Sequence, residues 1–185
     1  MKKTVLFAVA ALALIAGPAA ATDFSLYGAY WNTQDFDEAL GGGAKLRLGR
    51  YVELRGTYFS DVTADTDPER FDFEVSAIPI EAGLRFDFTH DAAFTPYAGA
   101  GAGYYLLDTT EGEIDDELGF YAVLGAEFGR QDSGLGFMVE GIYRQMEATV
   151  TDDPDDFPDP GDVRDEVVFN LDGLGVNAGI VWRFN

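Results

Sequence analysis

The residues that could carry out chemistry in this sequence are few, and their positions argue against catalysis. The single histidine, His90, falls in a short turn predicted at 89–93, and Ser133 falls in another short turn. A Ser/His site needs a nucleophile and a base within hydrogen-bond reach, and a third group that orients the base. Ordinary turn chemistry is therefore the simpler interpretation of both residues. The absence of cysteine excludes thiolate metal sites, disulfides and cysteine nucleophiles.

Two carboxylates, Glu81 and Glu140, form the second chemical candidate, because a pair of acids can cleave a glycosidic bond. Each has an arginine four residues further along, Arg85 and Arg144. In a strand, residues four apart point to the same face, so each acid is expected beside a cation. Salt bridges explain the two acids more simply, and we predict that the protein is not an enzyme.

A dense acidic run from 152 to 162 is the third candidate, and it would suit a divalent cation. Phe157 and Pro160 occupy positions that an EF-hand gives to a ligand and to glycine. We expect at most weak, multi-site Ca²⁺ or Mg²⁺ binding there and no other cofactor; the favoured alternative is a solubilising surface of a salt-adapted organism. The candidate ligands are Asp152, Asp153, Asp155, Asp156, Asp159 and Asp162.

Composition narrows the class of protein. The 185 residues carry a net charge of −21, which would repel a polyanion, so nucleic-acid binding is excluded. Hydrophobic residues make up 47% and aromatic residues 14% of the chain, far more than a disordered acidic segment carries. The chain is expected to form a packed structure.

The first 21 residues are predicted to be a secretory signal peptide. Lys2 and Lys3 precede an apolar run from Val5 to Ala16, and small residues of Ala-x-Ala type follow at 17–21. The apolar run is shorter than the roughly 20 residues that span a bilayer as a helix. We therefore expect residues 22–185 to form one exported domain.

Hydrophobic residues in that domain alternate with a period of two, the pattern of β-strands with one apolar face. From Ile80 to Phe88, for example, the even positions are apolar and the odd positions carry Glu81, Gly83, Arg85 and Asp87. The pattern predicts an all-β fold of eight strands and no convincing helix. The strands are expected near 23–32, 43–49, 51–59, 73–88, 94–107, 119–128, 135–147 and 167–184.

The connections between these strands alternate in length. They are short at 49–51, 89–93 and 129–134, whereas those near 33–42, 60–72, 108–118 and 148–166 are long and acidic. The long ones hold 22 acidic residues against two basic ones, Arg70 and Arg164. An even number of strands with short turns at one end and long loops at the other is typical of a transmembrane β-barrel with periplasmic turns and extracellular loops.

The polar faces decide between this barrel and a soluble β-sandwich. In a membrane barrel the apolar face meets lipid and the polar face fills the lumen. If 49–51 is a three-residue turn, Leu46 faces Leu54 and Arg47 faces Glu53, so apolar residues oppose apolar ones and charge opposes charge. We therefore predict that Arg47 and Glu53 interact in the lumen. The predicted lumen charges are Lys45, Arg47, Glu53, Arg55, Glu81, Arg85, Asp87, Glu127, Glu140, Arg144 and Arg183.

Aromatic residues on the predicted lipid face gather at its two ends, as the two interfaces of a bilayer select. Small and aliphatic residues lie between them. The group at the short-turn end is Phe24, Phe86, Phe88, Phe94, Phe128, Phe137, Trp182 and Phe184, and the group at the long-loop end is Tyr30, Tyr58, Tyr104, Phe120 and Tyr143.

The alternation changes phase in two places. Val75 and Ala77 are odd, yet the apolar residues from Ile78 onward are even; a similar change occurs between Leu171 and Leu174. Pro79 and Gly173 lie beside these points, and both residue types disturb β-ladders. We predict a β-bulge at each point, with outer loops as the alternative.

The last strand resembles the C-terminal β-signal that the outer-membrane assembly machinery of Gram-negative bacteria reads. The matching residues are Asn177, Gly179, Trp182 and Phe184, although Asn185 follows the aromatic that usually ends such chains. With the signal peptide, the eight strands and the Pro-Tyr-Ala-Gly-Ala-Gly sequence at 96–101, the chain resembles small outer-membrane β-barrels of the OmpA/OmpX or porin-like type.

This resemblance implies a location in the bacterial outer membrane, with lipid, lipopolysaccharide and the assembly machinery as partners. It implies a non-enzymatic role that is structural or at the cell surface. Eight strands enclose an interior just wide enough for side chains, and Tyr97, Tyr105 and Tyr121 are expected to occupy much of it. The alternative is a narrow channel or transporter for small or apolar molecules, as in OmpW-like proteins.

Overall fold

The structure is a computed structural model, and it describes residues 21–33, 38–63, 74–89, 93–109, 113–114, 116–129, 134–151 and 166–184. In these ranges no helix is long and apolar enough to cross a membrane. His90, Ser133, the acidic run at 152–162 and the predicted signal peptide up to residue 20 lie outside the described residues.

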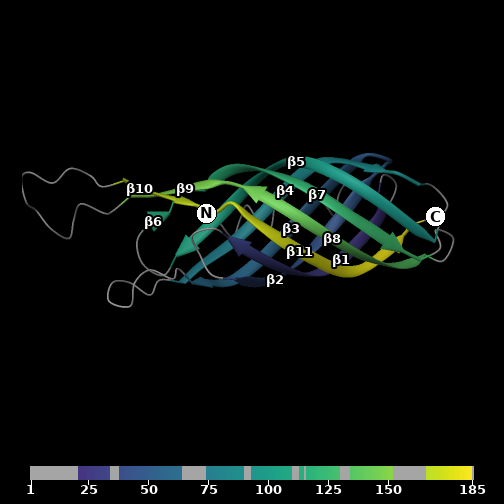
Figure 1. Cartoon of the computed structure of the whole chain (residues 1–185), viewed down its shortest axis with the longest axis horizontal. Coiled ribbons are helices and arrows are strands. Elements are labelled where there is room, and N and C mark those ends of the chain that lie inside the picture. Colours follow the sequence, from purple (N-terminus) through teal and green to yellow (C-terminus); the bar gives the residue numbers. More distant parts are fainter. Residues whose placement is uncertain are drawn as a thin grey trace, which may run out of the picture.

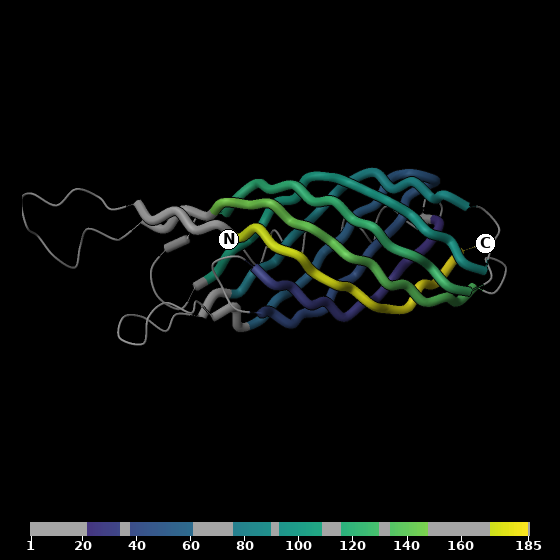
Figure 2. Tube along the Cα trace, viewed as in Figure 1, coloured from purple at the N-terminus to yellow at the C-terminus, as the bar shows by residue number. Residues whose placement is uncertain are grey.

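Eight antiparallel strands close into a barrel (Figure 1). Each strand pairs with its neighbours in the sequence, and the barrel closes where the first strand pairs with the last, with Leu26 opposite Ile180. Figure 2 shows these two strands, purple and yellow, side by side and slanted across the long axis. The barrel strands are β1 (Ala21–Thr33), β2 (Ala39–Leu48), β3 (Val52–Thr63), β4 (Glu74–Asp87), β5 (Phe94–Thr109), β7 (Glu117–Phe128), β8 (Leu135–Gln145) and β11 (Gly173–Arg183).

Closure matters because an open sheet would leave a row of unpaired N–H and C=O groups at its edge. All eight predicted segments carry a barrel strand, so the fold predicted from the sequence is confirmed.

A small second sheet extends the barrel at the long-loop end (Figure 1). It pairs β9 (Glu147–Thr151) with β10 (Glu166–Asn170) and with the two-residue strand β6 (Glu113–Ile114). β9 follows β8 after Met146 alone, and β10 precedes β11. The last predicted strand, 167–184, is thus two strands separated at Leu171 and Asp172.

The first hairpin has the register that the sequence predicts. Leu46 lies opposite Leu54, and Arg47 lies opposite Glu53. The turn is possible because Gly49 adopts a φ of +60°, a left-handed conformation that glycine reaches without steric cost. This register determines which side chains of β2 and β3 point into the lumen and which point to the outer wall.

The two predicted bulges are not found in the strands where we expected them. β4 pairs with β5 without a shift from Val75 to Asp87, and the irregularity lies in the neighbouring strand β3, between Phe59 and Val62. The second expected bulge, beside Leu171, is also absent from the described strands. β10 pairs with β9 and β11 pairs with β8 in one continuous register. The alternation changes because odd residues such as Ala77 and Leu171 point into a lumen that is apolar at this end.

Candidate functional site in the barrel lumen

The lumen holds the candidate site, because charged side chains from seven strands meet there. All eleven charged residues that the sequence assigns to the lumen take part in ion pairs with one another or with Asp23. Eight of them are buried, and Arg47, Asp87 and Arg183 at the short-turn end are of intermediate exposure.

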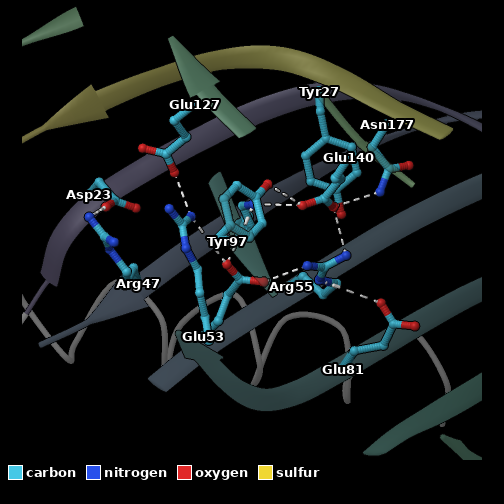
Figure 3. Close-up of polar contacts among 12 residues, drawn as sticks. Asp23, Tyr27, Arg47, Glu53, Arg55, Glu81, Tyr97, Glu127, Glu140 and Asn177 are labelled. Carbon is cyan, nitrogen blue, oxygen red and sulfur yellow. Dashed lines mark hydrogen bonds and ion pairs between the residues drawn. The ribbon is translucent and has the colours of Figure 1, made fainter. Parts of the chain in front are cut away.

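Glu140 on β8 is the acceptor at the centre of this network (Figure 3). It accepts hydrogen bonds from Lys45 Nζ at 2.9 Å, Arg55 Nη1 at 2.8 Å, Tyr97 OH at 2.7 Å and Asn177 Nδ2 at 2.8 Å. Two cations and two neutral donors from four different strands therefore converge on one buried carboxylate. Such convergence is what offsets the cost of removing a charge from water.

Glu81 on β4 is the second buried acceptor. Arg144 donates to it through Nε at 2.8 Å and Nη2 at 3.3 Å, and Tyr105 OH donates at 3.0 Å. Arg55 Nε lies 3.8 Å from Glu81 Oε2. Glu81 and Glu140 each form salt bridges, as predicted, but their partners come from other strands and not from the arginine four residues along. Glu81 pairs with Arg144, and Glu140 pairs with Lys45 and Arg55.

The network continues toward the short-turn end through shared cations. Glu127 pairs with Arg85 and, at 2.9 Å, with Arg183. Arg85 Nε also donates to Asp87 Oδ1 at 2.8 Å, and Arg47 Nη1 donates to Asp87 Oδ2 at 2.8 Å. A continuous series of alternating charges thus runs along this half of the barrel.

Asp23 is the lumen charge that sequence reasoning missed. It is fully buried at the start of β1 and pairs with Arg47. Its inclusion gives six carboxylates for six cations, so the network is electrically neutral. The signal was present in the alternation of Asp23, Ser25 and Tyr27 with Phe24 and Leu26.

The predicted interaction between Arg47 and Glu53 is wrong, although the two residues face each other in the register. Arg47 pairs with Asp23 and Asp87. Glu53 pairs instead with Arg55, two residues along the same face, and lies 3.4 Å from Lys45 Nζ and 3.8 Å from Arg85 Nη1. Long side chains in a narrow lumen reach partners on several strands, so the directly opposite residue has no special advantage.

Tyrosines fill the lumen between the charges, as predicted for Tyr97, Tyr105 and Tyr121, which are all buried. They do so by lying against glycines: a Cβ on Gly125 would come within 2.5 Å of the Tyr97 ring, and one on Gly101 within 2.7 Å of Tyr121. These two glycines therefore leave no open space of their own. Arg85 also lies 3.7 Å from the centroid of the Tyr97 ring, a cation–π contact.

The lumen changes character toward the long-loop end, where a set of buried apolar side chains replaces the charges. Trp31 and Phe59 pack with ring centroids 5.2 Å apart. Arg144 marks the boundary, since its guanidinium lies 5.4 Å and 5.5 Å from these two rings while it pairs with Glu81. We refer to the five large members of this set as the apolar plug: Trp31, Phe59, Leu107, Met146 and Leu171.

The outer wall has the aromatic arrangement that the sequence predicts. Phe88 and Phe137 are among the exposed aromatics at the short-turn end, and Tyr58 and Phe120 are among those at the long-loop end. Aliphatic side chains such as Leu124, which is 68% exposed, lie between them. A wall this apolar outside a lumen this charged is the inverse of a soluble barrel.

The residues of the predicted assembly signal divide between the two faces of β11. Asn177 is buried and bonded to Glu140, whereas Trp182 and Phe184 are exposed on the outer wall. Their role in assembly stays a prediction, and so does cation binding at 152–162, which falls outside the described residues. Within the described ranges no group of three potential ligands is placed to hold a metal ion.

Comparison with known proteins agrees with this geometry. A family model described as "Outer membrane protein beta-barrel domain" matches residues 5–184. No curated protein matches the sequence.

Solved structures resemble the fold at low sequence identity. The crystal structure of Neisserial surface protein A is 14% identical, covers 89% of this chain and 96% of its own, and has a TM-score of 0.57. Outer membrane protein AlkL, solved in lipid bilayers, is 14% identical over 90% of each chain, with a TM-score of 0.59. The E. coli outer membrane protein W is also 14% identical, covers 90% of this chain and all of its own, and has a TM-score of 0.57.

Proposed function

Because this chain belongs to the outer membrane protein β-barrel domain family, we propose that it is a closed, non-enzymatic barrel with a structural or cell-surface role in the bacterial envelope. The family places the protein in the bacterial outer membrane. The observation that carries the proposal is the filled lumen. Charges and tyrosines occupy one half, and the apolar plug occupies the other.

The filled lumen argues against general diffusion through the barrel. Of the twelve charged residues in the network, nine are buried, and each is within ion-pair distance of an opposite charge. Moving such a group aside to let a solute pass would leave its partner without its counter-charge. The lumen is therefore better suited to holding the barrel together than to passing solutes.

The partners in this proposal are outer-membrane lipid, lipopolysaccharide and the assembly machinery. The two exposed aromatic groups of the outer wall support the first two partners, since such groups anchor a protein at the two interfaces of a membrane. Trp182 and Phe184, exposed at the end of β11, support recognition of the last strand during assembly.

The apolar half of the lumen favours one alternative, a narrow path for small or apolar molecules. Trp31, Phe59 and Leu107 would offer such molecules an apolar surface, but in this structure they are buried together in one cluster. The alternative therefore requires the plug to move.

Conductance in planar lipid bilayers separates the two functions. The purified, refolded protein is expected to produce no steady current, with or without apolar solutes. A steady current that an apolar solute blocks would replace the proposed role with transport.

A further inference from the structure

The short-turn half of the lumen contains buried polar atoms that have no hydrogen-bond partner among the described residues. They include Ser25 Oγ, Arg47 Nε, Arg85 Nη2 and an oxygen of Asp23. Buried polar groups in proteins are nearly always satisfied, and ordered water satisfies those that protein atoms do not. The side chains of Arg47 and Asp87 at the same end are 11% and 16% exposed, so this end of the lumen contacts solvent on the periplasmic side.

The apolar plug offers water one side-chain partner, Trp31 Nε1, which is buried and has no hydrogen-bond partner among the described residues. Phe59, Leu107, Met146 and Leu171 carry no polar side-chain group that forms strong hydrogen bonds, and all four are buried. An apolar constriction excludes ions by dewetting, which is how hydrophobic gates in channels work. The ion path through the barrel thus ends at the plug, beyond the charge network.

Two aspartates at the long-loop rim hold the backbone of the plug. Asp116 Oδ1 accepts from the backbone N–H of Leu107 at 3.2 Å, and its Oδ2 accepts from Tyr104 OH at 3.3 Å. Asp172 repeats the arrangement with the N–H of Met146 at 2.8 Å and Tyr143 OH at 3.2 Å. We refer to each of these arrangements as an Asp–Tyr clasp.

The two clasps have the same spacing on two different strands. In each clasp the aspartate binds the backbone N–H of a plug residue. The tyrosine that it also binds is exposed on the outer wall and lies three residues before that plug residue in the sequence. Tyr104 and Tyr143 belong to the aromatic group at the long-loop interface, so each clasp links the membrane surface to the plug through one carboxylate.

Building on the closed barrel proposed above, we infer that the apolar plug, rather than the charge network, is the barrier to ions, and that the two Asp–Tyr clasps hold it shut. The barrel is then a half-channel, hydrated from the periplasm and closed by a dry layer under the loops. Loosening the plug or its clasps opens an ion path, whereas changing a salt bridge in the hydrated half does not.

Single-channel recording in planar bilayers tests the plug. Trp31→Ala/Phe59→Ala is expected to give stepwise currents, and Glu127→Gln is expected to stay silent. Tyr58→Ala/Phe120→Ala removes two exposed aromatics of the long-loop group from the outer wall and is the matched control, which should also be silent. Heat-modifiable migration on gels establishes that each barrel is folded, and Leu107→Ser is the milder plug variant if the double variant does not fold.

The clasps are tested in the Leu107→Ser background, where openings are measurable. Adding Asp116→Asn and Asp172→Asn is expected to raise the open fraction about tenfold, because hydrogen bonds to charged groups are stronger than those to neutral ones. Asp108→Asn, an exposed acid on the same strand as Leu107, is the control and should leave the open fraction unchanged.

Three results would overturn this inference. They are silence of both plug variants when folded, currents in Glu127→Gln equal to those of the plug variants, or equal open fractions for the clasp variant and Asp108→Asn. A steady current through the unchanged protein would instead overturn the proposed closed barrel, so the two failures are distinguishable.

Discussion

The side chains that fill the two halves of the lumen are held together by different forces. Toward the short turns, twelve charged side chains pair in a neutral network with Glu140 and Glu81 as its main acceptors. Toward the long loops, the plug packs by van der Waals contact, with Trp31 against Phe59. Both halves are buried. The stability of the first depends on the pairing of opposite charges, and the stability of the second depends on the close packing of apolar side chains.

The difference teaches where single substitutions do most harm. Removing one member of a buried ion pair leaves an uncompensated charge, whereas shortening an apolar side chain leaves a cavity. Both changes destabilise, but only the second opens space for an ion or a solute.

The largest effect is expected for Glu140→Gln. It should lower the free energy of unfolding by about 3–5 kcal/mol, because Lys45 and Arg55 lose the charge that both contact. Denaturant titration of the barrel in lipid vesicles measures this loss. Glu38→Gln changes an exposed acid at the long-loop rim and is the control. An equal loss of unfolding free energy in both variants would show that the charge network does not stabilise the barrel.

The plug should respond somewhat less. Leu107→Ala is expected to cost roughly 3 kcal/mol, within the range for truncating a buried leucine. Leu118→Ala, 74% exposed on the outer wall, should cost much less in the same titration. If the two truncations cost the same, the side chain of Leu107 is not packed as the structure has it.

The sequence predicted the wall of the barrel better than its interior. The period-two alternation and Gly49 were enough to set eight strands and the register of Arg47 against Glu53, because register is a backbone property that the pattern of faces determines. The alternation could not predict which charged side chains pair with each other. Arg47 selects Asp23 and Asp87 from neighbours on several strands, and only the assembled lumen defines that choice.

The apolar plug was the second feature that alternation alone did not predict. We assumed one polar and one apolar face along whole strands, so the inward position of Ala77 and Leu171 was interpreted as a change of register. In fact the lumen itself changes from polar to apolar along its axis. The signal peptide at 1–21 and the role of residues 152–162 depend on segments outside the described residues and stay predictions.

The choice of partner within the charged half gives a smaller, sharper test. A double-mutant cycle of Arg47→Met with Asp87→Asn should show a coupling of about 1 kcal/mol, as expected for residues in one ion-pair network. The cycle of Arg47→Met with Glu53→Gln should be nearly additive. Strong coupling in the second cycle and none in the first would restore the directly opposed pair.

The smallest effect on stability is expected at the outer wall. Phe184→Ala should leave export intact and change unfolding little, yet reduce the amount of folded protein in the outer membrane, since Phe184 belongs to the proposed assembly signal. Phe137→Ala removes another exposed aromatic at the same end, but from β8, and should assemble normally. Heat-modifiable protein in isolated outer membranes is the readout; equal yields would count against the signal.

Water contact along the lumen tests the contrast between the two halves most directly. Solid-state NMR of the protein in lipid bilayers can measure how fast magnetisation passes from water to each side chain, without any substitution. The side chains of Asp23, Glu53 and Arg85 are expected to gain magnetisation quickly, and those of Phe59, Leu107 and Met146 as slowly as the lipid-facing Leu26. Equally fast transfer to the plug residues would mean that the lumen is wet throughout, and would contradict a barrel closed by a dry apolar layer.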